Sequence, residues 1–180
     1  VRFSQVERTF NAAVLDLSPR AAGLVGFQTA QGPRRYRGRL RFIRRSPATV
    51  AIINVVDMED YLLGVVPAEM PADFEPAALR AQAIAARTFA WYQKRFYGPK
   101  RDDWDVLDNE GSQVYVGLQG ESRSPAGVQA VRDTCGIVCA CDTPEGPRIF
   151  PAYYSSTCGG VSRPGPRRKG EPEFPVLAGD

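Results

Sequence analysis

Seven alanines fall between Ala77 and Ala90, and this run constrains the fold more than any other feature of the sequence. Alanine has the highest helix propensity, and Pro76 stands where a first helical turn tolerates proline. Small side chains also let another element approach the helix backbone closely. We therefore predict a central, buried helix over residues 76–97. Three larger side chains add bulk to it: Leu79, Ile84 and Phe89.

The chain before this helix changes its periodicity at Asp57. Over residues 36–42, three arginines alternate with mostly apolar residues, which is typical of a half-buried strand. Residues 50–56 are rich in β-branched side chains and predict a buried strand. Helical spacing then begins, with Asp57 as the predicted N-cap. Residues 1–56 are therefore interpreted as an N-terminal β portion.

Two prolines, Pro67 and Pro71, bracket Glu69. Proline inside a helix removes a hydrogen bond and clashes with the preceding turn. Glu69 is therefore expected at a helix end or in a short turn.

The remainder of the chain reads as short elements joined by loops. We predict a loop at residues 98–111, a strand at 113–117 and a short helix at 125–131. Residues 134–141 and 148–155 are expected to form the two arms of a β-hairpin. The fold class is therefore α+β, with a β-rich C-terminal half. We predict three parts: the β portion at residues 1–56, a core at 57–162 and a Pro/Gly-rich extended tail at 163–180.

Charge is unevenly composed, because 20 of the 23 basic residues are arginine and the net charge is only +3. Seven arginines lie between Arg34 and Arg45. Such a cluster suits an anionic polymer or lipid head groups, but a solvated strand face explains it equally simply. We expect the solvated face, and no nucleic-acid partner.

No histidine is present, which excludes a Ser-His-Asp or Cys-His nucleophile and any histidine-ligated metal from this chain. No apolar stretch is long enough for a transmembrane helix. The chain begins at Val1 without a signal segment, so we interpret it as a mature or trimmed piece.

Four cysteines suggest disulfides and an oxidising compartment more than a zinc site of four thiolates. They are Cys135, Cys139, Cys141 and Cys158. A bridge from Cys158 to one of the other three would join the predicted hairpin to a glycine turn. The pairing stays open, and a free buried thiol is the alternative for each.

Glu69 is a single carboxyl among apolar neighbours. Desolvation favours the protonated form of a carboxyl, and a protonated carboxyl can act as a general acid. A cap or surface role is the alternative. Arg80 and Arg87 lie about two helical turns apart on one face. A helix hairpin around Pro71 would turn that face towards Glu69, as donors for sugar hydroxyls or a lactyl carboxylate; pairing with surface acids is the alternative.

These residues form part of a longer pattern that resembles the SpoIID/LytB family. The pattern runs in order from about residue 50 to 162 and includes Val66-Pro67-Ala68-Glu69-Met70-Pro71. It continues through residues 78–90, 113–117, 130–136 and 153–160.

The resemblance implies a peptidoglycan lytic transglycosylase, the activity of the family's best-known branch, which acts in sporulating bacteria. It implies that Glu69 is the catalytic acid and that Arg80 and Arg87 are site residues. Glu69 would protonate the oxygen between N-acetylmuramic acid and N-acetylglucosamine, then accept the proton of the muramyl C6 hydroxyl as a 1,6-anhydro ring closes. Further candidates to hold the sugars are Gln113, Tyr115, Tyr153, Ser156 and Thr157; core packing is the alternative for the two tyrosines.

Two departures from the family pattern bear on cofactors. Some members bind zinc before the Gln-Val-Tyr strand, but the aligned residues here are Lys100, Val106 and Ser112, and none is a ligand. We therefore expect no metal and no cofactor. Ser155 replaces the family's usual histidine, which leaves the proton transfers to Glu69.

The resemblance also implies an extracytoplasmic location and glycan strands as the partner. Other wall hydrolases or amidases are further candidate partners, and a membrane anchor would lie outside the visible chain. Two alternatives stay open. One is a non-catalytic glycan-binding modifier that enhances a wall amidase, as in the LytB branch. The other is a hydrolase in which Asp105 or Asp108 activates water.

Overall fold

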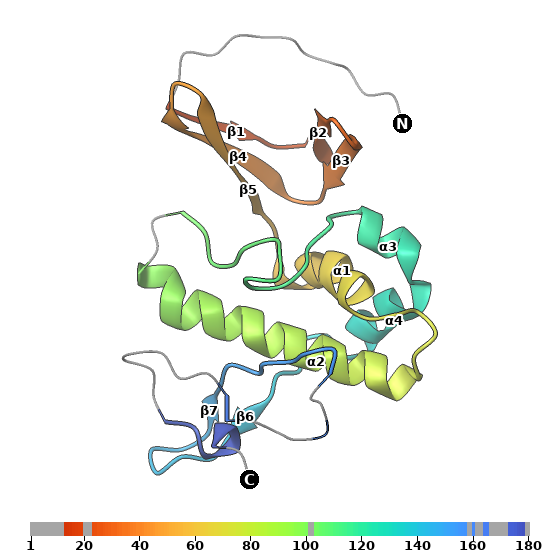
Figure 1. The fold of residues 1–180 in the computed structure, drawn as a ribbon, viewed down its shortest axis with the longest axis vertical. Helices are drawn as coiled ribbons and strands as arrows, with labels where there is room; N and C mark the ends of the chain where they lie inside the picture. Colours follow the sequence, from red (N-terminus) through yellow and green to blue (C-terminus); the bar gives the residue numbers. More distant parts are fainter. Residues whose placement is uncertain are drawn as a thin grey trace. The chain divides into compact units, whose positions relative to one another are not determined.

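A computed structural model describes residues 13–19, 23–100, 103–157, 160, 164–165 and 173–178. The chain forms two compact units, Val1–Val56 and Asp57–Asp180 (Figure 1). Strands dominate the first unit and helices the second. The predicted α+β class is confirmed.

The N-terminal unit holds a three-stranded antiparallel sheet and a hairpin. The sheet has the order β1-β4-β5, formed by Val14–Leu17, Arg39–Ser46 and Thr49–Val55. The hairpin pairs β2, Val25–Thr29, with β3, Gly32–Tyr36. Phe27 joins the two layers, because its ring stacks on Tyr36 at 5.8 Å and meets Phe42 edge-on at 6.4 Å between centroids. Leu40 is only 1% exposed and lies at the centre of this small core.

Two strand predictions in this unit were wrong in detail. The strand expected over residues 36–42 is interrupted, because Gly38 takes a φ of +71° and Arg39 begins β4. The strand expected to be buried, now β5, lies beside β4 at one end of the strand order. Its Val50 and Ile52 side chains are therefore 52% and 43% exposed.

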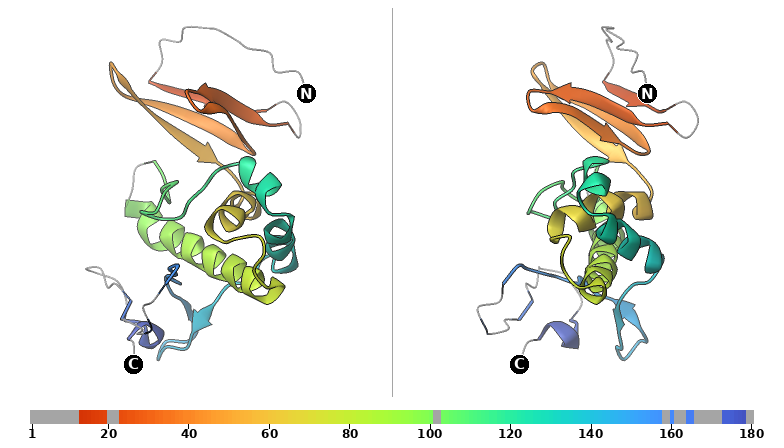
Figure 2. Two further views of the ribbon diagram at one scale, coloured as in Figure 1. Left: turned by 45° about the vertical axis from the view of Figure 1, so that its right-hand side comes forward. Right: turned by 90° about the vertical axis from the view of Figure 1, so that its right-hand side faces the viewer.

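The second unit is built around α2, Pro76–Tyr92. Three other helices accompany it: α1, Met58–Glu69; α3, Gln119–Arg123; and α4, Pro125–Asp133. Helices α1 and α4 contact α2 and each other. The two-residue strands β6, Ala140–Cys141, and β7, Arg148–Ile149, lie on the other side of α2 from α1 (Figures 1 and 2).

The prediction of a buried alanine-rich helix is confirmed. Ala83 and Ala86 are fully buried, and Leu79 is 1% exposed. The regular α-helix ends at Tyr92, earlier than expected. A π-helical turn, Gln93–Tyr97, and a 3-10 turn, Gly98–Lys100, continue the chain.

Two further expectations need correction, and one helix was not foreseen. The hairpin is shorter than expected, since only Ala140–Cys141 and Arg148–Ile149 pair as strands. The sequence did not predict α3, Gln119–Arg123. The described end of the tail is not extended, because Pro175–Leu177 forms a 3-10 turn and Phe174 is 6% exposed, edge-on to Tyr92 at 5.9 Å. No helix in the described ranges has the length and apolar character needed to cross a membrane.

Candidate functional site

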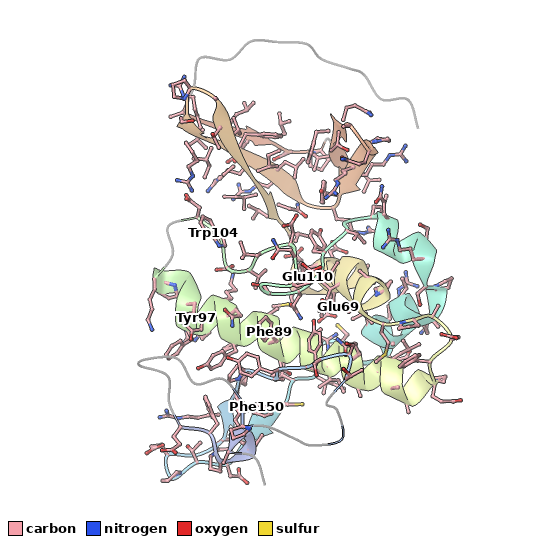
Figure 3. The ribbon with its side chains drawn as sticks, viewed as in Figure 1. Glu69, Phe89, Tyr97, Trp104, Glu110 and Phe150 are labelled. Carbon is pink, nitrogen blue, oxygen red and sulfur yellow. The ribbon has the colours of Figure 1, made fainter. Side chains whose placement is uncertain are left out.

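Glu69 is the last residue of α1 and is half-buried (Figure 3). Pro67 lies inside the helix rather than ending it, and the Met70 N–H still donates to the Val66 carbonyl at 3.2 Å. Pro71 follows, where the chain leaves the helix. The prediction that Glu69 stands at a helix end is thus confirmed.

An extended segment, residues 113–117, lies along the C-terminal half of α1. The Val114 N–H donates to Glu69 Oε1 at 2.6 Å, and the Val116 N–H donates to the Gly64 carbonyl at 3.3 Å. Alternate amides of an extended chain point the same way, so both reach the helix. The strand predicted here is therefore wrong: the amides of Val114 and Val116 bond to a helix instead of another strand, and Gly117 takes a φ of +60°.

Gly64 makes this close approach possible. A Cβ built on Gly64 would lie 2.5 Å from the Tyr115 ring and 2.9 Å from the Gly117 carbonyl oxygen. Any larger residue would push the segment, and with it the Val114 amide, away from α1.

A buried hydrogen-bond chain adjoins Glu69. The Tyr61 hydroxyl donates to Gln113 Oε1 at 3.0 Å. Gln113 Nε2 then donates to the Ala86 carbonyl at 3.2 Å and to the Tyr154 hydroxyl oxygen at 3.0 Å. These contacts use both ends of the amide and so define its orientation. They also occupy the Tyr154 oxygen as an acceptor.

Tyr154 therefore keeps its own proton for another partner, and the Glu69 carboxyl lies near enough for its charge to act on this hydroxyl. Burial raises the pKa of Tyr154 above its ordinary value of 10.0 despite the opposing hydrogen bond from Gln113, and the charge of Glu69 raises the pKa further. Burial likewise raises the pKa of Tyr61. Both tyrosines stay neutral near pH 7, so Tyr154 keeps an O–H group near the Glu69 carboxyl.

Arg87 does not belong to this site, which corrects a prediction. Its side chain is 2% exposed, and its guanidinium grips Glu59 with Nε–Oε1 and Nη2–Oε2 distances of 2.8 and 2.7 Å. It also donates to the Ile137 and Val131 carbonyls at 3.0 and 3.3 Å. With its donors used by the protein, Arg87 ties α1, α2 and the end of α4 together rather than holding a sugar.

Glu59 is the acidic half of this pair. Burial works to raise its pKa, but the hydrogen bonds from Arg87 and the Gly136 N–H, with the charge of Arg87, bring the pKa below its ordinary value of 4.5. Glu59 is thus held as a carboxylate.

Arg80 also lies beside α4. It lies 3.9 Å from Asp133 on α4, so the prediction that Arg80 and Arg87 share a face is confirmed. The face of α2 that carries both arginines packs towards α4. Phe89, which packs edge-on against Tyr153 at 5.9 Å, lies about 200° around the helix from Arg87. The expected convergence of both arginines on Glu69 is therefore wrong.

The remaining predicted residues divide into packing and surface positions. Tyr115 is 8% exposed, with its ring 4.9 Å from that of Tyr61, so it is a core residue. Tyr153 packs on Phe89. Ser156 and Thr157 are exposed, and the Thr157 carbonyl accepts a hydrogen bond from Ser155 Oγ at 3.2 Å. Gln113 is at the site, but it orients Tyr154.

Sequence reasoning missed Tyr154, Tyr61 and the Val114 amide. Tyr154 was within reach, because it adjoins Tyr153 in the same motif and neighbouring side chains of an extended segment point to opposite sides. A main-chain amide carries no residue signature, so Val114 could not have been found this way.

Within the part of the chain that the structure describes, no lysine or arginine pairs with Glu69. The same residues hold no cluster of three potential metal ligands. Asp105 is paired with Lys94 at 3.4 Å.

Cys135, Cys139 and Cys141 are free thiols, and the first is exposed. The predicted bridge from Cys158 to one of them is not seen; Cys158 itself lies outside the described residues.

Comparison with known proteins places these residues in a family context. The SpoIID family, described as stage II sporulation protein, matches residues 46–140. An uncharacterized protein of Brachyspira hyodysenteriae is 34% identical over 125 residues, which cover 69% of this chain and 32% of that protein. No solved structure gives a significant match.

Two relatives carry the name stage II sporulation protein D. The protein of Bacillus amyloliquefaciens is 39% identical over 71 residues, covering 36% of this chain and 21% of the relative. The protein of Bacillus subtilis strain 168 is 43% identical over 54 residues, which cover 26% of this chain and 16% of the relative. The chain thus spans a third or less of the length of these curated relatives.

Proposed function

The chain belongs to the SpoIID family, and we propose on that premise that it is a peptidoglycan lytic transglycosylase in which Glu69 is the acid and then the base. It would act on glycan strands outside the cytoplasm. No cofactor enters the proposed reaction.

One arrangement carries this proposal: Glu69, half-buried, accepts a hydrogen bond from the Val114 N–H, lies near the neutral Tyr154 hydroxyl and has no described cation beside it. A carboxyl in an ion pair would be held as a carboxylate and could not give up a proton near pH 7. Glu69 has donors that can stabilise its charge after the proton leaves.

The proposed reaction needs a single carboxyl. Protonated Glu69 gives its proton to the oxygen between N-acetylmuramic acid and N-acetylglucosamine. The bond from muramyl C1 to that oxygen breaks, and the glucosamine part leaves with the proton as a hydroxyl. The Val114 N–H and the Tyr154 O–H then stabilise the Glu69 carboxylate.

Ring closure returns the proton to Glu69. The muramyl C6 hydroxyl oxygen bonds to C1 as its proton passes to the carboxylate, which yields a 1,6-anhydro end. Water takes no part. Hydrolytic glycosidases differ in using a second carboxylate to activate water or attack the sugar.

Replacing Glu69 by Gln tests the proposal, because the amide keeps the shape but cannot donate an acidic proton. We expect about a hundredfold loss or more in the release of 1,6-anhydro-muramyl ends from purified glycan strands, measured by mass spectrometry. Glu75→Gln is the matched control, since Glu75 is exposed and its side chain makes no capping bond. Full activity in Glu69→Gln would refute the proposal.

One observation favours a second candidate, the non-catalytic modifier of a wall amidase. The two arginines expected to hold substrate turn towards α4 instead of Glu69. This function predicts that the protein binds glycan strands and raises amidase activity, yet creates no new ends in either the wild type or Glu69→Gln.

The same product analysis tests a hydrolase. Glu69 and Asp108 both help to raise the pKa of Tyr61, so both carboxylates act on one hydroxyl. Reducing muramyl ends, instead of anhydro ends, would identify water as the attacking group and point to Asp108.

A further inference from the structure

The two units of the chain carry opposite net charges. Residues 1–56 contain ten arginines, no lysine and two acidic residues, Glu7 and Asp16, which gives a net charge of +8. Residues 57–180 contain thirteen basic and eighteen acidic residues, a net charge of −5. The overall +3 therefore conceals a strongly basic N-terminal unit, which a negatively charged surface would attract in preference to the rest of the chain.

The turn between β4 and β5 projects from this basic unit (Figure 2). Strand β1 pairs with β4 as far as Val14 with Ile43, and the Arg44 N–H still donates to the Ala13 carbonyl at 2.9 Å, so among the described residues this pairing ends at Arg44. Every residue from 44 to 50 is exposed. We call residues 44–50 with Ile52 the β4–β5 tip; it contains two arginines and no acid.

Apolar side chains share the tip with the arginines. Val50 and Ile52 are 52% and 43% exposed. Arg44 pairs with Val50 in the strand register, and Ile52 is the next residue on that face. Pro47 and Ala48 form the turn and are exposed as well. Cationic and aliphatic groups therefore meet at one end of a hairpin.

Asp16 is the acidic residue that the structure describes in this unit, and it pairs with arginines outside the tip. The Asp16 carboxylate accepts hydrogen bonds from Arg41 Nε and Nη2 at 2.8 and 2.9 Å. Arg39 Nη1 lies 3.9 Å from Asp16 Oδ2. In the strand register, Arg39 and Arg41 lie on the opposite face of β4 from Arg44. No described acid forms an ion pair with Arg44.

We propose that the β4–β5 tip docks on an anionic lipid surface. Arg44 and Arg45 meet the head-group phosphates, whose oxygens suit the planar guanidinium, and Val50 and Ile52 enter the boundary between head groups and acyl chains. A hydrated phosphate polymer offers no place for exposed valine and isoleucine. The tip has no aromatic ring on which a nucleic-acid base could stack.

Vesicle binding tests this inference. We expect the protein to co-sediment with vesicles of equal parts phosphatidylglycerol and phosphatidylcholine, and not with vesicles of phosphatidylcholine alone. Arg44→Gln with Arg45→Gln should weaken binding about twenty-fivefold, at about fivefold for each arginine. The matched control, Arg123→Gln with Arg132→Gln, removes two exposed arginines from the acidic unit and should change binding less than about threefold.

A second pair of variants separates lipid from other polyanions. Val50→Thr with Ile52→Thr keeps β-branched residues on the strand, leaves the charge unchanged, and should weaken vesicle binding about tenfold. Val176→Thr, at a 48% exposed valine of the other unit, is its control. Unchanged melting temperatures would show that these exposed positions do not alter the fold.

Three results would overturn the inference. These are equal losses in the tip and control variants, unchanged binding in the threonine variant, or tighter binding to inorganic polyphosphate than to vesicles at equal phosphate concentration. The last two would assign the arginines to a phosphate polymer. Glu69→Gln should bind vesicles like the wild type, so this inference and the proposed reaction can fail separately.

Discussion

Tyr154 links the buried hydrogen-bond chain to the proposed acid. Its oxygen accepts from Gln113 at 3.0 Å, which leaves its proton for the Glu69 carboxylate in the proposed reaction. A hydrogen bond to a charged group contributes about 1.5–3 kcal/mol. The hydroxyl therefore matters most when Glu69 has lost its proton.

Replacing Tyr154 by Phe should lower the rate of anhydro-end release about ten- to a hundredfold, because the Glu69 carboxylate then loses one donor. Tyr153→Phe, the same change in the neighbouring residue, is expected to cost less, since Tyr153 packs on Phe89. Initial rates on the same glycan preparation would measure both. A larger loss at Tyr153 would show that the wrong tyrosine has been assigned to Glu69.

At the scale of single residues, the sequence predicted the position of Glu69 but not the surroundings of the arginines. Pro67 and Pro71 were enough to place Glu69 at a helix end. Helical spacing showed correctly that Arg80 and Arg87 share a face, but spacing cannot tell which neighbour that face meets. The α4 helix meets it, and Glu59 on α1 completes the pair with Arg87.

Among the elements, helix α1 and the segment 113–117 fit together only because residue 64 is glycine. Gly64→Ala would place a methyl group 2.5 Å from the Tyr115 ring and 2.9 Å from a backbone oxygen. We expect a loss of about 1–3 kcal/mol in unfolding free energy from overpacking, which outweighs the better helix propensity of alanine.

Urea titration would measure this loss, with Gly98→Ala as the control. At Gly98 the nearest atom to an added Cβ is the end of the Asp105 side chain, which can move. Equal stability in Gly64→Ala and the wild type would mean that the segment does not lie against α1.

The Arg87–Glu59 pair joins α1 and α2 and should make stability depend on pH. Because the folded state lowers the pKa of Glu59 from 4.5, the pair stabilises the fold above that value and its contribution is lost as the pH falls through the folded pKa. Glu59→Gln should be less stable than the wild type at pH 7, and the gap should narrow in acid.

Thermal unfolding across the acidic range would record both curves. Glu145→Gln is the control, because Glu145 and Arg148 form an exposed pair at 3.7 Å that contributes little. A constant gap between Glu59→Gln and the wild type at all pH values would argue against a carboxylate bound to Arg87.

Periodicity predicted the elements more reliably than it predicted their partners. The alanine-rich helix was clear because composition and spacing agree. The segment 113–117 has the alternation of a strand, but the pattern cannot show that its amides bond to Gly64 and Glu69. Val50 and Ile52 resembled a buried strand for the same reason, since β-branched residues also occur at exposed edges.

For the molecule as a whole, the opposite charges of the two units should make lipid binding and glycan cutting respond differently to salt. Exposed charges are screened within about 3 Å at 1 M salt, so vesicle binding should fall steeply as salt rises. The proposed reaction depends on Glu69 and its two donors, so cutting of short soluble glycans should fall much less. Parallel losses in sedimentation and product release would indicate that one surface serves both.

The contact between Val114 and Glu69 has a consequence for how this protein can vary. The group that grips the carboxyl is a peptide N–H, which nineteen of the twenty amino acids supply equally well. Many different residues can therefore replace Val114 while the hydrogen bond to Glu69 is kept, and proline is the substitution that removes it. A deep mutational scan should therefore find most substitutions tolerated at position 114 and proline not tolerated.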